Sequence, residues 1–260
     1  MIHNFIIYIY MCISARASVF SFLINLVSCV ALIFFGNKNL KFYNYVFASF
    51  LFFVSLMQLV DLGIWSDINC SKGYNKIASF FGPILIYLQP LFIVFAYLYL
   101  VKMTKVGKDF YNKNIKSKEN SWFDHFNLNY KGLNFIKLIN IIYGIILIIA
   151  WYQFYSKSFT TNPEYLCTKT SKSGNLKWNW FDSNVDLLKW FFILYHIVVI
   201  NIIALNPWSN YLKIALILFY GMLFITSRIK KYSKLEVWCY IINFSAIFLL
   251  LIQKLFPQIN

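Results

Sequence analysis

The chain has 260 residues, of which 60% are hydrophobic and 13% charged, with a formal net charge of +15 and a mean hydropathy of +0.61. About a quarter of the residues of a soluble domain are charged, so this composition excludes an ordinary soluble globular protein. The apolar residues also come in long blocks, and we therefore predict an integral membrane protein.

Seven apolar blocks are long enough to cross a bilayer, which takes about 20 residues of helix. Backbone groups in lipid must hydrogen-bond within their own segment, so we predict an all-α fold: an integral membrane bundle of seven transmembrane helices. All seven belong to a single domain spanning 1–260. The expected spans are 14–35, 43–65, 77–101, 134–155, 186–205, 209–228 and 235–256.

The first predicted span carries a polar stripe. Ser14, Ser18, Ser21, Asn25 and Ser28 recur every three or four residues, which places them on one helical face. A polar face in a membrane helix turns toward protein or water. We interpret the stripe as part of a polar pocket, and close packing between helices is the alternative.

The second span ends with three polar or amphipathic residues on one face, Gln58, Asp61 and Trp65. An ionised side chain at the bilayer centre costs at least about 2.5 to 3.5 kcal/mol, so such groups normally pair and face inward. Arg16 lies at a similar depth in the first span and is the expected salt-bridge partner of Asp61. The alternative is that both reach separately to lipid headgroups.

The third span holds Gln89 directly before Pro90, with Pro83 two turns earlier. A proline interrupts the backbone hydrogen bonds and kinks a helix, which is one way to line a cavity. Polar residues also occur in the fifth and seventh spans. The predicted ligand-binding residues are Arg16, Asn25, Gln58, Asp61, Trp65, Gln89, His196 and Asn243.

Two polar segments connect the spans. Residues 102–134 are predicted to form a basic loop, whose seven lysines and three acids suit anionic headgroups on the cytoplasmic side. No nucleic-acid-binding module is recognisable, so nucleic acid is not an expected partner. Residues 156–185, which include Trp178 and Trp180, are predicted to fold as an aromatic loop over the opposite face.

Cys70 and Cys167 both fall at the end of the bundle that holds the N-terminus. They form a disulfide in an oxidising compartment, or they stay unpaired. Lysines and arginines are nearly balanced between the two ends, so the positive-inside rule decides little. From the cysteines and the acids we expect an exoplasmic or lumenal N-terminus and a cytoplasmic C-terminus.

Several chemistries of membrane proteins lack their residues here. No lysine lies midway along the last span to bind retinal, a single intramembrane histidine cannot build a zinc site, and phosphate-binding glycine loops are absent. We expect no cofactor and no metal. We favour a transporter- or receptor-like protein that binds a small molecule or ion. The alternatives are an intramembrane enzyme acting on lipid, with Asp61 and His196 as acid and base, and a structural membrane protein.

Short motifs are scattered over most of the chain: MCISARAS, MQLVDLGIW, CTKTSKSGNLKWNW and VWC, with Asn75, Lys76, Pro83, Gln89 and Pro90. Together they resemble a group of uncharacterised multi-pass proteins encoded by large DNA viruses of algae and amoebae. Arg16 stands where that group would have an acid, and Asp61 where a glutamate would be usual. The resemblance implies a viral or algal membrane protein, in a host or virion membrane, and supplies no activity.

Overall fold

The computed structural model describes residues 14–114, 130–160, 163–170, 176–178, 195 and 234–255, and this part of the chain is almost entirely helical. Its α-helices are α2 (Ala15–Phe35), α3 (Lys41–Trp65), α4 (Tyr74–Met103), α5 (Lys105–Asn114), α6 (Tyr130–Thr160) and α9 (Lys234–Leu255). The shorter elements are the 3-10 helices η1 (Lys38–Leu40) and η4 (Pro163–Leu166) and the antiparallel strands β1 (Lys169–Thr170) and β2 (Leu176–Lys177).

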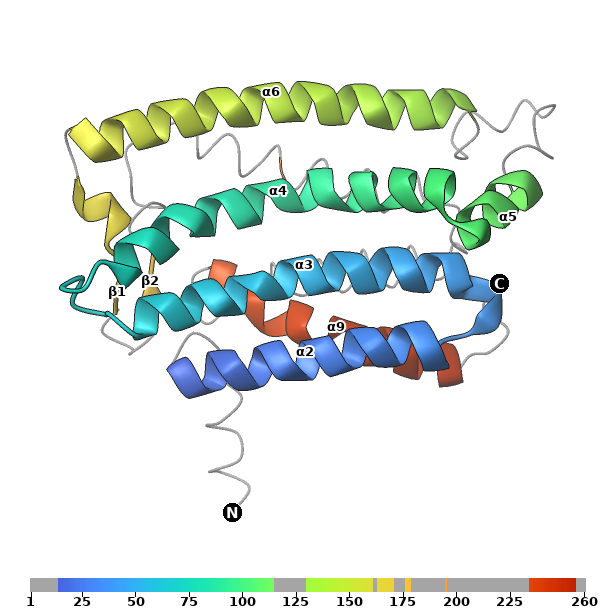
Figure 1. Ribbon diagram of the computed structural model, residues 1–260, viewed down its shortest axis with the longest axis horizontal. Helices are drawn as coiled ribbons and strands as arrows, with labels where there is room; N and C mark the ends of the chain where they lie inside the picture. Colours follow the sequence, from blue (N-terminus) through green and yellow to red (C-terminus); the bar gives the residue numbers. More distant parts are fainter. Residues whose placement is uncertain are drawn as a thin grey trace, which may run out of the picture.

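The long helices α2, α3, α4 and α6 lie side by side, and α9 packs against α2 and α3 (Figure 1). Among the described residues, four helices have the length and composition to cross a membrane: Ala15–Phe35, Lys38–Trp65, Tyr74–Met103 and Lys137–Ser156. The all-α prediction is confirmed, apart from the small hairpin. The last predicted span coincides with α9. Of the spans 186–205 and 209–228 only Tyr195 is described, so the number seven stays a prediction.

Helix α2 is built with its polar face inward. Ser18, Ser21, Asn25 and Ser28 are buried against the other helices, as the stripe indicated. The opposite face is apolar and exposed, the reverse of a soluble amphipathic helix, and lipid is the medium that such a face fits. The large exposed side chains of this face are Val19, Phe20, Leu23, Val27, Val30 and Phe34.

Two tyrosines of α6 hold α4 near its prolines. The hydroxyl of Tyr143 donates to the backbone carbonyl of Tyr87 at 2.8 Å, and that of Tyr155 donates to the carbonyl of Phe80 at 2.5 Å. Each acceptor lies three residues before a proline of α4, Pro90 or Pro83. Because a proline disturbs the backbone hydrogen bonds of the preceding turn, these hydroxyls supply donors where the helix is weakest.

An amide network fixes α9 at the corner between α2 and α3. Gln253 of α9 accepts from the backbone N–H of Asn37 at 2.8 Å and donates to the side-chain oxygen of Asn44 at 2.8 Å. The amide of Asn44 donates in turn to the carbonyl of Asn37. A Cβ at Gly36 would lie 2.4 Å from the Asn44 nitrogen, so only glycine fits the corner.

The segment predicted as a basic loop, 102–134, is partly helical. It contains α5, and α6 already begins at Tyr130. Helix α5 forms because Thr104 caps its first turn, accepting from the Gly107 N–H at 3.0 Å, and because Val106 and Phe110 pack on the aromatic end of α3. The loop prediction missed this short amphipathic pattern among the lysines.

Replacing Tyr143 by phenylalanine should destabilise the bundle by about 1 kcal/mol, because the buried hydrogen bond from its hydroxyl to the carbonyl of Tyr87 is lost. Tyr152→Phe is the matched control, since that side chain lies on the same helix and is 76% exposed. Unfolding of both variants in detergent, followed by tryptophan fluorescence, measures the difference. Equal stability of the two variants would contradict the role assigned to Tyr143.

Candidate functional site

Helices α2 and α3 meet along a polar interface. The side-chain amide of Asn25 is fully buried and donates to the backbone carbonyl of Leu51 at 3.1 Å. The two helices are antiparallel (Figure 1), so this bond sets their register. Moving four residues along each helix from this bond places Ser21 opposite Ser55, and moving seven residues places Ser18 opposite Gln58. We call this set, which Asp61 extends by one turn, the polar seam.

The acidic member of the polar seam is Asp61, whose side chain is 0% exposed. Gln58 lies one turn earlier on the same face and is 2% exposed. In the part of the chain that the structure describes, the buried oxygen of the Gln58 amide has no hydrogen-bond partner, and neither has the buried indole nitrogen of Trp65. The seam therefore keeps hydrogen-bonding capacity beside a carboxylate.

Arg16 does not join the polar seam. Its side chain is exposed, and among the described residues no ion pair links it to Asp61. The expected salt bridge is therefore wrong. The reason is angular: Arg16 is two residues from both Ser14 and Ser18, which at 100° per residue puts it on the far side of the helix from the stripe. Equal depth in the membrane was not sufficient to pair the two charges.

Gln89 belongs to a different contact. It is buried in α4 and accepts a hydrogen bond from the hydroxyl of Tyr195 at 2.6 Å. This bond places Tyr195 against α4. His196 lies outside the described residues, and Asn243 is placed in α9 without a described side chain. Of the predicted ligand-binding residues, the structure groups Asn25, Gln58 and Asp61 along the polar seam.

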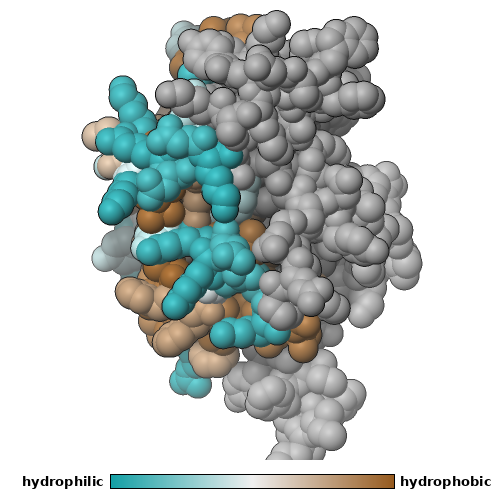
Figure 2. Space-filling view, turned by 90° about the vertical axis from the view of Figure 1, so that its right-hand side faces the viewer, coloured by the Kyte–Doolittle hydropathy of each residue, from teal (hydrophilic) through white to brown (hydrophobic). Residues whose placement is uncertain are grey.

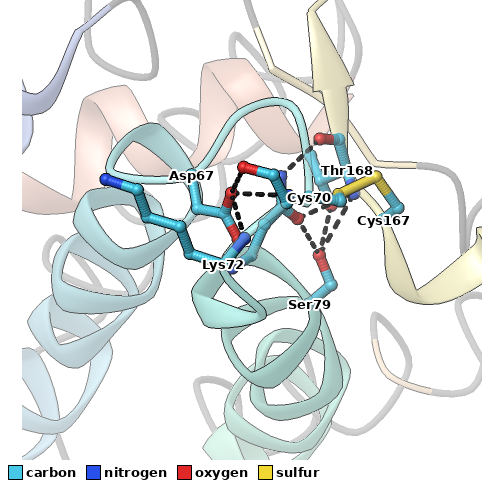
Figure 3. Close-up of a disulfide and its surroundings, with 8 residues drawn as sticks. Asp67, Cys70, Lys72, Ser79, Cys167 and Thr168 are labelled. Carbon is cyan, nitrogen blue, oxygen red and sulfur yellow. Dashed lines mark hydrogen bonds between the residues drawn. A yellow bond between two sulfur atoms is a disulfide. The ribbon is translucent and has the colours of Figure 1, made fainter.

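Just beyond the C-terminal end of α3, the end that holds Asp61, Cys70 and Cys167 form a disulfide that joins segments 97 residues apart (Figure 3). It attaches the end of η4 to the turn between α3 and α4. Cys70 has a φ of 57°, in the left-handed region, and Gly73 has a φ of 87°. These two residues let the turn reverse sharply before α4.

Asp67 organises the same turn. Its carboxylate accepts from the backbone N–H groups of Ser71 at 2.8 Å, Lys72 at 3.0 Å and Asn75 at 3.4 Å. Burial alone would raise the pKa of Asp67, but these hydrogen bonds, with one from the Ser71 hydroxyl, outweigh it and hold the pKa below its ordinary value. The negative charge at the first turn of α4 also suits the helix dipole.

A buried polar cluster lies beside the disulfide. Asn75 donates to the carbonyl of Thr168 at 2.8 Å and accepts from its N–H at 2.9 Å, while the hydroxyls of Ser79 and Thr168 lie 2.7 Å apart. All three side chains are 0% exposed. The sequence reasoning missed this cluster, although the pair Asn75 and Ser79, four residues apart at the start of a span, was a signal for it.

The aromatic segment after the hairpin also reaches the bundle. Trp178 is buried, and a Cβ at Gly82 of α4 would lie 2.6 Å from its ring. The indole thus occupies the space that this glycine leaves. Trp180 and part of segment 156–185 lie outside the described residues, so the aromatic loop over this face stays a prediction.

In the described ranges, no group of three or more histidine, cysteine, aspartate or glutamate residues could hold a metal ion. Comparisons of the chain with protein families, with curated proteins and with solved structures found no match. The resemblance to viral multi-pass proteins therefore stays a prediction.

The pH dependence of stability should report on Asp67. Its lowered pKa means that its charge stabilises the fold above the unfolded pKa of about 4, and that this contribution is lost as the pH falls through the folded pKa. Asp67→Asn should therefore be less stable than the wild type at neutral pH, and the gap should close in acid. Thermal unfolding across this range measures it, with the exposed Asp109→Asn as control. A gap that persists unchanged in acid would contradict the assignment.

Proposed function

We propose that this chain is a membrane protein of seven transmembrane helices that binds a small cation inside its bundle, with Asp61 as the residue that carries the compensating charge. The class is that of ion-binding transporters and receptors.

The burial of Asp61 carries this proposal. A carboxylate with no exposed surface lies in a helix of membrane-spanning length, where ionised groups are costly and mark ion pathways and proton relays. Beside it the polar seam supplies neutral oxygen atoms, from the Gln58 amide and from the hydroxyl of Ser18, which the register of α2 and α3 places opposite Gln58. Oxygen ligands of this kind suit hard cations and protons.

The disulfide supports the proposed orientation. Disulfides persist in oxidising compartments, so the end with Cys70 and Cys167 is assigned to the exoplasmic or lumenal side. The opposite end, with α5, is then cytoplasmic. With seven spans, the N-terminus lies on the oxidising side and the C-terminus in the cytoplasm.

The enzyme alternative depends on Asp61 and His196 sharing one reacting centre. His196 lies outside the described residues, so no contact supports that pairing. A purely structural role predicts instead that no ion changes the stability of the protein through Asp61. Of the enzymatic, structural and cation-binding roles, the neutral oxygen atoms of the polar seam favour cation binding.

Thermal unfolding of the detergent-purified protein in sodium, potassium or N-methylglucamine chloride at matched ionic strength tests the proposal. A cation at about a hundred times its Kd stabilises the folded state by about 2.7 kcal/mol, so sodium or potassium should raise the Tm above its value in the large organic cation. Asp61→Asn should abolish the rise, and Asp67→Asn, whose carboxylate lies outside the span, should retain it. An ion response that survives Asp61→Asn would contradict the proposal, as would a wild type that responds to neither ion.

A further inference from the structure

The end of the bundle opposite the disulfide is strongly basic. Among the described residues of this end, Asp109 is the one acid. Figure 2 looks onto the end and shows hydrophilic side chains gathered over it, beside apolar ones. We call this surface the basic end; its exposed lysines are Lys38, Lys41, Lys102, Lys105, Lys108, Lys113, Lys137 and Lys254.

Helix α5 holds part of this surface in a fixed position. Phe110 stacks on Phe42 of α3, with ring centroids 4.3 Å apart, and meets Tyr43 edge-on at 5.2 Å. The start of α5 is equally tight, because a Cβ at Gly107 would lie 2.0 Å from the carbonyl oxygen of Leu100. With its apolar side chains packed on α3 and α4, the lysine-bearing face of α5 points away from the bundle.

The depth of these lysines relative to the membrane follows from their positions in the sequence, which lie close to the ends of the spans. Helix α5 begins two residues after the end of α4, which has the length of a membrane span. Lys38 and Lys41 flank the corner between two further spans, and Lys254 is in the last turn of α9. Such positions lie at the level of the lipid headgroups, where a short amphipathic helix rests in the plane of the interface.

We propose that the basic end binds the headgroups of anionic phospholipids, with Lys102, Lys105 and Lys108 as the part of the site carried by α5 and its junction with α4. Ammonium groups near a membrane surface attract anionic lipids, and the attraction falls off within a Debye length. A nucleic acid would meet the same charges, but a bilayer around the spans already presents phosphates at the depth of the lysines. This inference is independent of the cation site at Asp61.

Native mass spectrometry of the full-length protein in detergent tests the inference, with phosphatidylglycerol and phosphatidylcholine as probes. Each lysine near the surface contributes about fivefold in affinity, so replacing Lys102, Lys105 and Lys108 by glutamine should weaken phosphatidylglycerol binding at least about tenfold. Phosphatidylcholine binding should not change. The matched control replaces Lys72, Lys76 and Lys169, which are exposed at the opposite end, and should bind phosphatidylglycerol as the wild type does.

Replacing the same three α5-side lysines by arginine keeps the charge and should keep the affinity. Equal losses in the two glutamine variants, a wild type without preference for phosphatidylglycerol, or a loss in the arginine variant would each overturn the inference. So would a glutamine variant that binds phosphatidylglycerol normally but loses affinity for a duplex oligonucleotide. The substituted side chains are exposed, and unchanged thermal unfolding of each variant verifies that the fold is intact.

Discussion

The structure depends on one constraint: polar groups that lie at membrane depth have to find their partners inside the protein. Helix α2 shows the consequence most directly, because its serines and Asn25 are buried while its phenylalanines and valines face outward. The bond from Asn25 to the carbonyl of Leu51 satisfies the amide and also fixes the register of α2 against α3. In this bundle, buried polar groups thus fix how the helices pack, as buried apolar groups do in the core of a soluble protein.

The same constraint explains how α4 tolerates two prolines. Tyr143 and Tyr155 of α6 bring hydroxyl donors to carbonyls in the turns that Pro90 and Pro83 disturb. At the two ends of the bundle, side chains bond the backbone of the connecting turns. Asp67 does so beside the disulfide at one end, and Gln253 does so at the corner between α2 and α3 at the other. The side chain of Asp61 is also fully buried in this interior, and the proposed cation site is built on it.

The sequence predicted the parts of the fold that periodicity governs. Four of the predicted spans, the inward stripe of α2 and the burial of Gln58 and Asp61 follow from spacing and hydropathy alone. Arg16 was misplaced because depth was weighed without helical angle. Helix α5 and the cluster of Asn75 with Thr168 were not predicted for a different reason: their local sequence signals are short, and both also depend on contacts between segments far apart in the chain.

The most direct test of the account is the orientation of α2. Nitroxide labels placed one at a time at positions 19–30, with Cys12, Cys29 and Cys239 replaced by serine, report collisions with molecular oxygen, which concentrates in lipid. In the reconstituted protein, oxygen accessibility should oscillate with the helical period, with maxima at Phe20, Leu23 and Val27 and minima at Ser21, Asn25 and Ser28. A flat profile, or one in which the serine face is the accessible one, would contradict a polar interior in an apolar shell.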